Sequence, residues 1–123
     1  MSSIESKPQY VEVAAAATKY VEIGVDGSGL HSVQIGWPDA VSSATITLHT
    51  SNWPREEVAF DSTSAMHWYD ESTAPVPVTI TGPSAAAIGG CLVHLGNVGA
   101  KRGRLKIVAA ATTKLWILPH GKS

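Results

Sequence analysis

Five histidines are the residues of this chain best suited to bind a metal ion or to transfer protons. No two of them have the spacing of a zinc site, and no cluster of cysteines or carboxylates accompanies them. We therefore expect polar positions in strands and loops, and no metal site. The five are His31, His49, His67, His94 and His120.

Two adjacent carboxylates and one thiol are the other groups that could act on a substrate. Asp70 and Glu71 are neighbours in the chain, whereas a glycosidase needs two carboxylates that face each other across the substrate, ~5–9 Å apart. His94 follows Cys91 by three residues in a predicted strand, which places the two side chains on opposite faces. We expect an inert, buried thiol and no catalytic residues, cofactor or enzyme activity.

Composition limits the class of protein further. The chain has 123 residues, enough for one domain, with 44% hydrophobic and only 15% charged residues, which suggests that partners cover part of its surface. A net charge of −1 argues against a dedicated nucleic-acid binder. No apolar run reaches the ~18 residues of a membrane helix, and Met1–Gln9 lacks the cationic start of a secretory signal. We therefore expect synthesis in a cytoplasm.

Turn residues divide the chain into short strands. Turn signals recur about every 8–12 residues, the spacing of a sandwich or barrel, and the glycine-rich segments lack the Gly-Lys-Ser/Thr ending of a phosphate loop. This pattern predicts an all-β fold: a single antiparallel β-sandwich, jelly-roll-like, with eight or nine short strands over residues 19–123 and an extended N-terminal arm over residues 1–18. The strands are expected at Lys19–Val25, Leu30–Trp37, Val41–Thr50, Val58–Phe60, Met66–Tyr69, Val76–Thr81, Ala87–Leu95, Arg102–Ala110 and Thr113–Leu118, and Tyr10–Val13 has the composition of one more.

A basic stripe lies on one strand near the C-terminus. Residues 102–107, RGRLKI, alternate basic with small or apolar residues, so the basic side chains share one sheet face. Two interpretations stay open: a charged face or an edge guarded against aggregation, and docking onto an acidic partner surface. In the second, Arg102 and Arg104 are the docking residues.

Four tryptophans are many for a chain of this length: Trp37, Trp53, Trp68 and Trp116. Tryptophan suits a core, a protein interface or a sugar platform. Trp53, in a loop, is the best candidate for an exposed contact. Strand Thr113–Leu118 is apolar on both faces, as in strands covered on both sides. Since a sandwich covers only one face, we expect self-association with Trp116 and Leu118 as interface contacts.

The C-terminal half contains three elements in a characteristic order. These are the turn Gly82-Pro83, the hairpin sequence HLGNVGAKRGR of residues 94–104, and the ending Gly121-Lys122. In this order they resemble the closing region of small β-sandwich virion proteins of tailed bacteriophages. The segment TLHTSNWP of residues 47–54 is weakly similar to the same group, and the N-terminal arm shows no match.

The resemblance implies a structural role in a virion and no catalytic residues. The expected function is that of a capsid decoration or cement protein that self-associates, here taken as a trimer, and binds the major capsid protein or other virion proteins. A tail or head–tail connector accessory is one alternative. A carbohydrate-binding module, which would require coplanar exposed tryptophan rings beside Asn or Asp, is another. The N-terminal arm is a candidate strand donor to a neighbour's sheet edge. No nucleic acid or membrane is expected as a partner.

Overall fold

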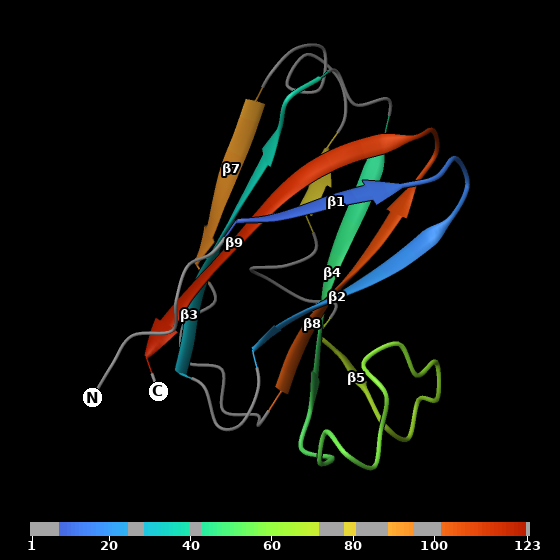
Figure 1. Ribbon diagram of the computed structural model, residues 1–123, viewed down its shortest axis with the longest axis vertical. Helices are drawn as coiled ribbons and strands as arrows, with labels where there is room; N and C mark the ends of the chain where they lie inside the picture. Colours follow the sequence, from blue (N-terminus) through green and yellow to red (C-terminus); the bar gives the residue numbers. More distant parts are fainter. Residues whose placement is uncertain are drawn as a thin grey trace.

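The computed structural model describes residues 8–24, 29–39, 43–71, 78–80, 89–94 and 102–122, which form two antiparallel sheets packed face to face (Figure 1). Sheet A has the strand order β1-β9-β3-β7, and sheet B has the order β2-β8-β4-β5, with β6 also paired to β4. The strands are β1 Gln9–Val13, β2 Thr18–Gly24, β3 Gly29–Trp37, β4 Ala44–Ser51, β5 Tyr69–Glu71, β6 Val78–Ile80, β7 Gly89–His94, β8 Arg102–Ala109 and β9 Thr113–Lys122.

The order of the strands is that of a jelly roll. The first four strands alternate between sheets A and B, and β8 and β9 return to lie beside β2 and β1. The four-stranded orders β1-β9-β3-β7 and β2-β8-β4-β5, connected in this way, are the jelly-roll arrangement, and β6 adds a fifth strand to sheet B. The prediction of an all-β, antiparallel, jelly-roll-like sandwich is therefore confirmed. The described residues include no helix long and apolar enough to cross a membrane.

The core lies between the sheets, and the period-two pattern of the strands fills it. In β4, Ala44, Ile46 and Leu48 point inward, as predicted. In β9, Leu115 and Ile117 are fully buried. Alternating apolar residues supply the inward face of each strand because successive side chains point to opposite faces. The core cluster comprises Val11, Val13, Val21, Ile23, Val33, Ile35, Trp37, Ala44, Ile46, Leu48, Leu105, Ile107, Ala109, Leu115 and Ile117.

The predicted arm contributes a strand to the sandwich. Within residues 1–18, Gln9–Val13 forms β1 and pairs with β9, because Val11 and Val13 add to the core. Residues Ala14–Ala17 form a tight turn, in which the Ala17 N–H donates to the Ala14 carbonyl oxygen at 3.0 Å. This turn carries the chain from sheet A to sheet B. Residues 1–7 lie outside the described part of the chain.

Two predicted strands, Val58–Phe60 and Met66–Tyr69, are wrong. Residues 52–68 form one long loop, and the only regular strand nearby, within the described chain, starts at Tyr69. Backbone turns organise the loop: the N–H groups of Glu57 and Val58 both donate to the Pro54 carbonyl oxygen at 3.1 Å. The short apolar runs look like strands because Val58 and Trp68 are buried, but they are buried beneath the loop itself.

Candidate functional site

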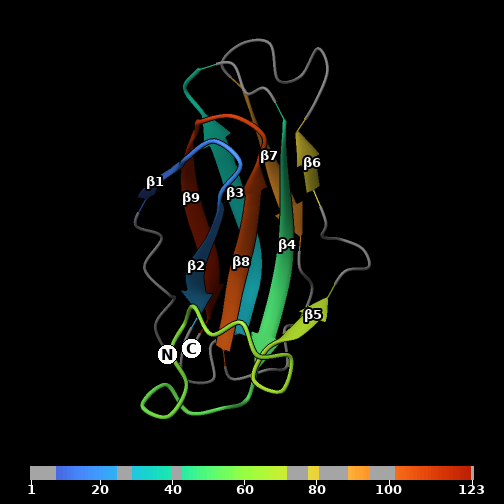
Figure 2. The same ribbon diagram turned by 90° about the vertical axis from the view of Figure 1, so that its right-hand side faces the viewer.

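The outer faces of the two sheets differ in how they are covered. The loop of residues 52–68 crosses the outer face of sheet B at the ends of β2, β8 and β4, as Figure 2 shows in green. No described segment covers the outer face of sheet A in the same way. The chain's own loop thus covers one end of the outer face of sheet B, and none of the described residues covers the outer face of sheet A.

Arg102 binds the loop of residues 52–68 to sheet B at one point. Its side chain is only 1% exposed. The Nε–H donates to Glu22 Oε2 at 2.8 Å, and Nη1 donates to the Val58 carbonyl oxygen, also at 2.8 Å. The guanidinium carbon lies 4.8 Å from the centroid of the Trp68 ring. A buried cation is tolerated here because a carboxylate, a carbonyl and an aromatic face all compensate it.

Arg104 fastens the loop at a second point and is 2% exposed. Its Nη1 group donates to the carbonyl oxygens of Phe60 and Ser62, both at 2.7 Å. Its Nε and Nη2 groups reach Nδ1 of His49 at 3.1 and 2.9 Å. Every one of these bonds joins β8 either to the loop or to β4, so Arg104 holds three segments together.

Two aromatic rings hold the Arg104 guanidinium group in place. Its central carbon lies 4.0 Å from the Tyr20 ring centroid and 4.3 Å from that of Trp68. The predicted alternation of β8 is confirmed, since Leu105 and Ile107 lie in the core and the arginines lie on the other face. Docking of Arg102 and Arg104 onto a partner stays a prediction, but the structure gives both of them partners within the chain.

His49 is held in its neutral form by this arrangement. Because Arg104 donates to Nδ1, the ring proton must reside on Nε2, which lies 3.8 Å from Asp70 Oδ2, too far for a hydrogen bond. Burial, and secondarily the charge of Arg104, lowers the pKa of His49, while Asp70 opposes the shift. The imidazole therefore acts as a hydrogen-bond acceptor, which protonation would abolish.

The outer face of sheet A carries large apolar side chains in an ordered row. Tyr10, Trp116, Gly36 and Gly90 are register partners on β1, β9, β3 and β7. Tyr10 and Trp116 are 48% and 41% exposed, and their rings lie 5.2 Å apart, tilted by 56°. We call this set the aromatic–glycine row. It combines two protruding rings with two positions that have no side chain.

A second row lies beside it on the same face. Leu118, Gln34 and Leu92 are register partners on β9, β3 and β7, and Leu92 is 54% exposed. Leu118 is partly buried. The structure thus brings Trp116 and Leu118, two predicted contacts, onto one open face. Whether they contact a partner stays a prediction. Sequence reasoning did not identify Leu92 as a member of this surface.

Trp53, the remaining predicted contact, lies in the loop over sheet B, 38% exposed. Its indole N–H donates to the Met66 carbonyl oxygen at 3.2 Å, and its ring meets that of His67 edge-on at a centroid distance of 5.2 Å. Trp53 is therefore an exposed aromatic with a fixed orientation. It belongs to a different surface from Trp116.

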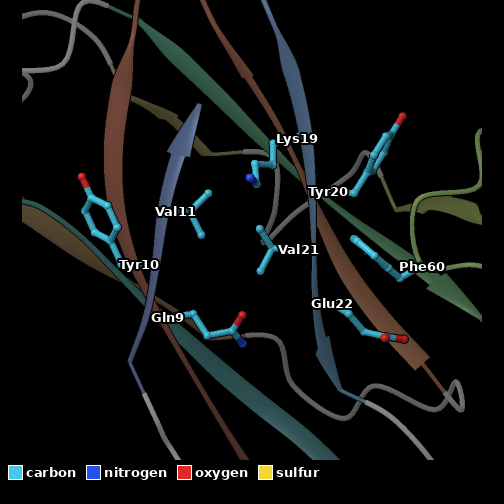
Figure 3. A pocket seen from close by; sticks show the side chains of 8 residues that line it. All are labelled: Gln9, Tyr10, Val11, Lys19, Tyr20, Val21, Glu22 and Phe60. Carbon is cyan, nitrogen blue, oxygen red and sulfur yellow. The ribbon is translucent and has the colours of Figure 1, made fainter. Parts of the chain in front are cut away.

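A groove of about 320 Å³ lies between the edge strands β1 and β2 (Figure 3). Val11 and Val21 point into the gap between the two strands, whereas Tyr10 points away from it. Glu22, on its rim, is already bound to Arg102. Among the described strands, β1 pairs only with β9 and β2 only with β8, so the groove is where the predicted strand donor could add; this stays a prediction.

The groups that could support catalysis or bind a metal are dispersed. Asp70 and Glu71 lie next to each other in β5. Cys91 packs against the core, and burial raises the pKa of its thiol. Over the described residues, no group of three or more His, Cys, Asp or Glu is placed to hold a metal ion.

Comparison with known proteins supports the fold only. No family model matches the chain, and no curated protein has a similar sequence. The crystal structure of PirA is similar to it with a TM-score of 0.58 and 10% identity, over 96% of both chains. The structure of tomato aspermy virus gives a TM-score of 0.42 at 7% identity, over 96% of this chain and 78% of that one. At 10% identity, the similarity to PirA shows a shared fold alone. The TM-score of 0.42 is too low to show that tomato aspermy virus shares the fold.

Proposed function

We propose that this chain is a structural protein of a virion that acts by docking onto other folded proteins. The finer form of the proposal is a capsid decoration or cement protein that self-associates and binds capsid subunits. It has no catalytic task in this proposal. The observation that carries it is the outer face of sheet A, which no described segment covers and on which Tyr10, Trp116 and Leu92 are about half exposed.

An exposed surface of this kind favours docking on physical grounds. Single exposed apolar residues are normal, but a contiguous apolar patch on a soluble domain commonly marks an interaction site. Tryptophan and tyrosine are also the residues enriched at the energetic centres of protein interfaces. The chain's own loop covers one end of the outer face of sheet B, whereas no described segment covers that of sheet A, so sheet A is the face on which we place the partner.

The virion assignment is supported by the resemblance of the C-terminal half to tailed-phage virion proteins. The jelly-roll fold does not identify the function, because capsid proteins, lectins and cupins all have it. A tail or head–tail connector accessory would use the same kind of docking face. Decoration of the capsid is the form we favour, because an exposed apolar face suits repeated contacts on a regular shell, where many weak contacts add up by avidity.

A carbohydrate-binding module is the second candidate, because exposed aromatic rings can stack on sugars. The tilt of 56° between the rings of Tyr10 and Trp116 does not give the coplanar platform that this function requires. Among the described neighbours of Trp116 in its row, Gly36 and Gly90 offer no side-chain hydrogen bonds to sugar hydroxyls. Docking onto protein is therefore the better fit.

Particles from the virus that encodes this chain provide the test. We expect the chain to co-purify with intact particles in many copies, and particles lacking it to lose DNA at a lower temperature. Trp116→Ala should reduce its occupancy on particles. Val108→Ala is the matched control, because Val108 has the same 41% exposure on the outer face of sheet B. Absence from particles, together with saturable binding on a glycan array, would favour the carbohydrate module.

A further inference from the structure

Gly36 occupies a place in sheet A where the described chain supplies no need for a glycine. Its pairing with Gly90 and Trp116 is in continuous register, so it marks no bulge. A Cβ at Gly36 would meet only the Gly89 carbonyl oxygen at 3.9 Å, whereas one at Gly90 would come within 2.9 Å of the Ile35 carbonyl oxygen. Glycine inside a strand costs stability and commonly marks close approach of another molecule. Gly36 therefore points to a contact beyond the described residues.

The aromatic–glycine row consists of two large side chains followed by two positions that have no side chain. Tyr10 and Trp116 stand on β1 and β9, and Gly36 and Gly90 lie on β3 and β7. The centre of the four-stranded sheet falls between β9 and β3. A second copy of the row, rotated by a half turn about this centre, presents a glycine to each ring of the first copy. A row with this property is complementary to itself.

We propose that a second copy of this chain docks face to face on sheet A, related by a twofold axis parallel to β9 and β3. This arrangement places Trp116 over the partner's Gly36, and Tyr10 over the partner's Gly90. Each ring enters a hollow, as facing layers do when large and small residues alternate, and the contact is isologous, as in most homodimers. The inference rests on the proposed docking function of this face and names its partner.

The charge on the face fits a copy of the same chain as the occupant. An isologous contact brings identical surfaces together, so like charges near its centre would repel. The two central rows carry no charged residue. Beside them, Lys114 is the register partner of Glu12 and lies 3.8 Å from Asp39, so the charges there are of opposite sign and adjacent. A partner selected by charge would instead need a charged face here.

The area of the outer face of sheet A is consistent with a weak dimer. From Lys114 to His120 across four strands, the face measures roughly 450 Å² in projection, given ~3.4 Å per residue and ~4.8 Å between strands. Protruding side chains raise the accessible area above this projection. Standard interfaces bury about 800 Å² per partner, and transient ones less. We therefore expect dissociation of the isolated dimer at low concentration.

The test fills the hollow without disturbing the monomer. Gly36→Val adds a side chain for which the chain has room, and valine favours strands. Sedimentation velocity over a range of concentrations should show reversible dimers for the wild type, and a dimer at least about tenfold weaker for this variant. Its thermal midpoint should be equal or higher. Thr45→Val, at an exposed position of β4 in sheet B, is the matched control and should dimerise normally.

The outcomes separate this inference from the proposed function. A wild-type chain that stays monomeric throughout would overturn the homodimer; if Trp116→Ala still reduced particle occupancy, the docking function would stand with another partner. Dimerisation that Trp116→Ala abolishes but Gly36→Val leaves intact would overturn the arrangement alone. Gly36→Ser, a smaller intrusion, keeps the test available if the valine variant does not fold, and it should weaken the dimer in the same direction.

Discussion

Replacing Arg104 by methionine should release the loop of residues 52–68 from sheet B. Methionine keeps an unbranched apolar chain of similar length but removes every guanidinium N–H. The variant loses the bonds to the carbonyl oxygens of Phe60 and Ser62 at 2.7 Å and those to His49. It also loses the cation between the aromatic rings of Tyr20 and Trp68.

The size of the effect follows from these contacts. Hydrogen bonds to a charged group each contribute about 1.5–3 kcal/mol, so the two short bonds to the loop set a scale of about 3–6 kcal/mol. Water can satisfy the freed carbonyl oxygens at the surface, and the methionine side chain recovers part of the apolar burial. We expect the free energy of unfolding to fall by about 3 kcal/mol, and the thermal midpoint to fall by roughly 10–15 °C.

Urea unfolding followed by tryptophan fluorescence measures the loss, and hydrogen exchange of residues 52–68 locates it. Arg104→Lys keeps the charge but cannot form the forked bonds, so it should lose most of the same stability. Lys106→Met, on the same face of the same strand, should stay within ~0.5 kcal/mol of the wild type. If Arg104→Met lost less than ~1 kcal/mol and exchange in the loop were unchanged, the fastening role would be refuted.

Three further predictions concern buried groups. The folded-state pKa of His49 lies below its unfolded value of ~6.5, so the unfolded chain binds the proton first and the free energy of unfolding should fall as the pH drops below ~6.5. In urea titrations over this pH range, His49→Gln should flatten the dependence. A variant with the same pH dependence as the wild type would contradict the prediction. Gly89→Ala should cost about 1–3 kcal/mol by calorimetry, because its Cβ would lie 2.7 Å from the Trp37 indole nitrogen, whereas Gly36→Ala should be neutral or stabilising; equal losses would count against the packing argument. Cys91, with its raised pKa, should react with a disulfide reagent much more slowly in the folded than in the unfolded chain, and rapid labelling of the native protein would show an accessible thiol.

The sequence predicts the strands well where the period-two pattern is long. Residues 44–49, ATITLH, alternate apolar with polar residues, and residues 102–107, RGRLKI, alternate basic with small or apolar ones. The expected ends, Thr50 and Ala110, lie within one residue of the observed ends of Ala44–Ser51 and Arg102–Ala109. The pattern is informative there because a strand with one face in the core must repeat every two residues. It fails at Val58 and Trp68, where two short apolar runs are buried by a loop, because burial alone does not distinguish a strand from a covered turn.

The surroundings of the basic stripe could not be predicted for a different reason. Alternation places Arg102 and Arg104 on the face opposite the core, but it says nothing of what lies over that face. Their partners Glu22 and Phe60 are 80 and 44 residues away in the chain, and only the folded topology brings them together. Gly36, by contrast, did leave a signal, since a lone glycine within a strand pattern suggests a bulge or a close approach.

The outer faces of the two sheets differ in the bonds that a docking partner would have to break. On sheet B, the chain uses its own loop carbonyls to satisfy Arg102 and Arg104, and docking there would require these bonds to break. On sheet A, docking beside Tyr10 would disturb a long contact, in which the Tyr10 hydroxyl lies 3.4 Å from Glu12 Oε1. A partner that covers sheet A thus gains apolar burial at little cost in lost bonds, whereas one that approaches the basic stripe must first displace the loop. An acidic surface that bound these arginines would have to replace the bonds that both already make within the chain.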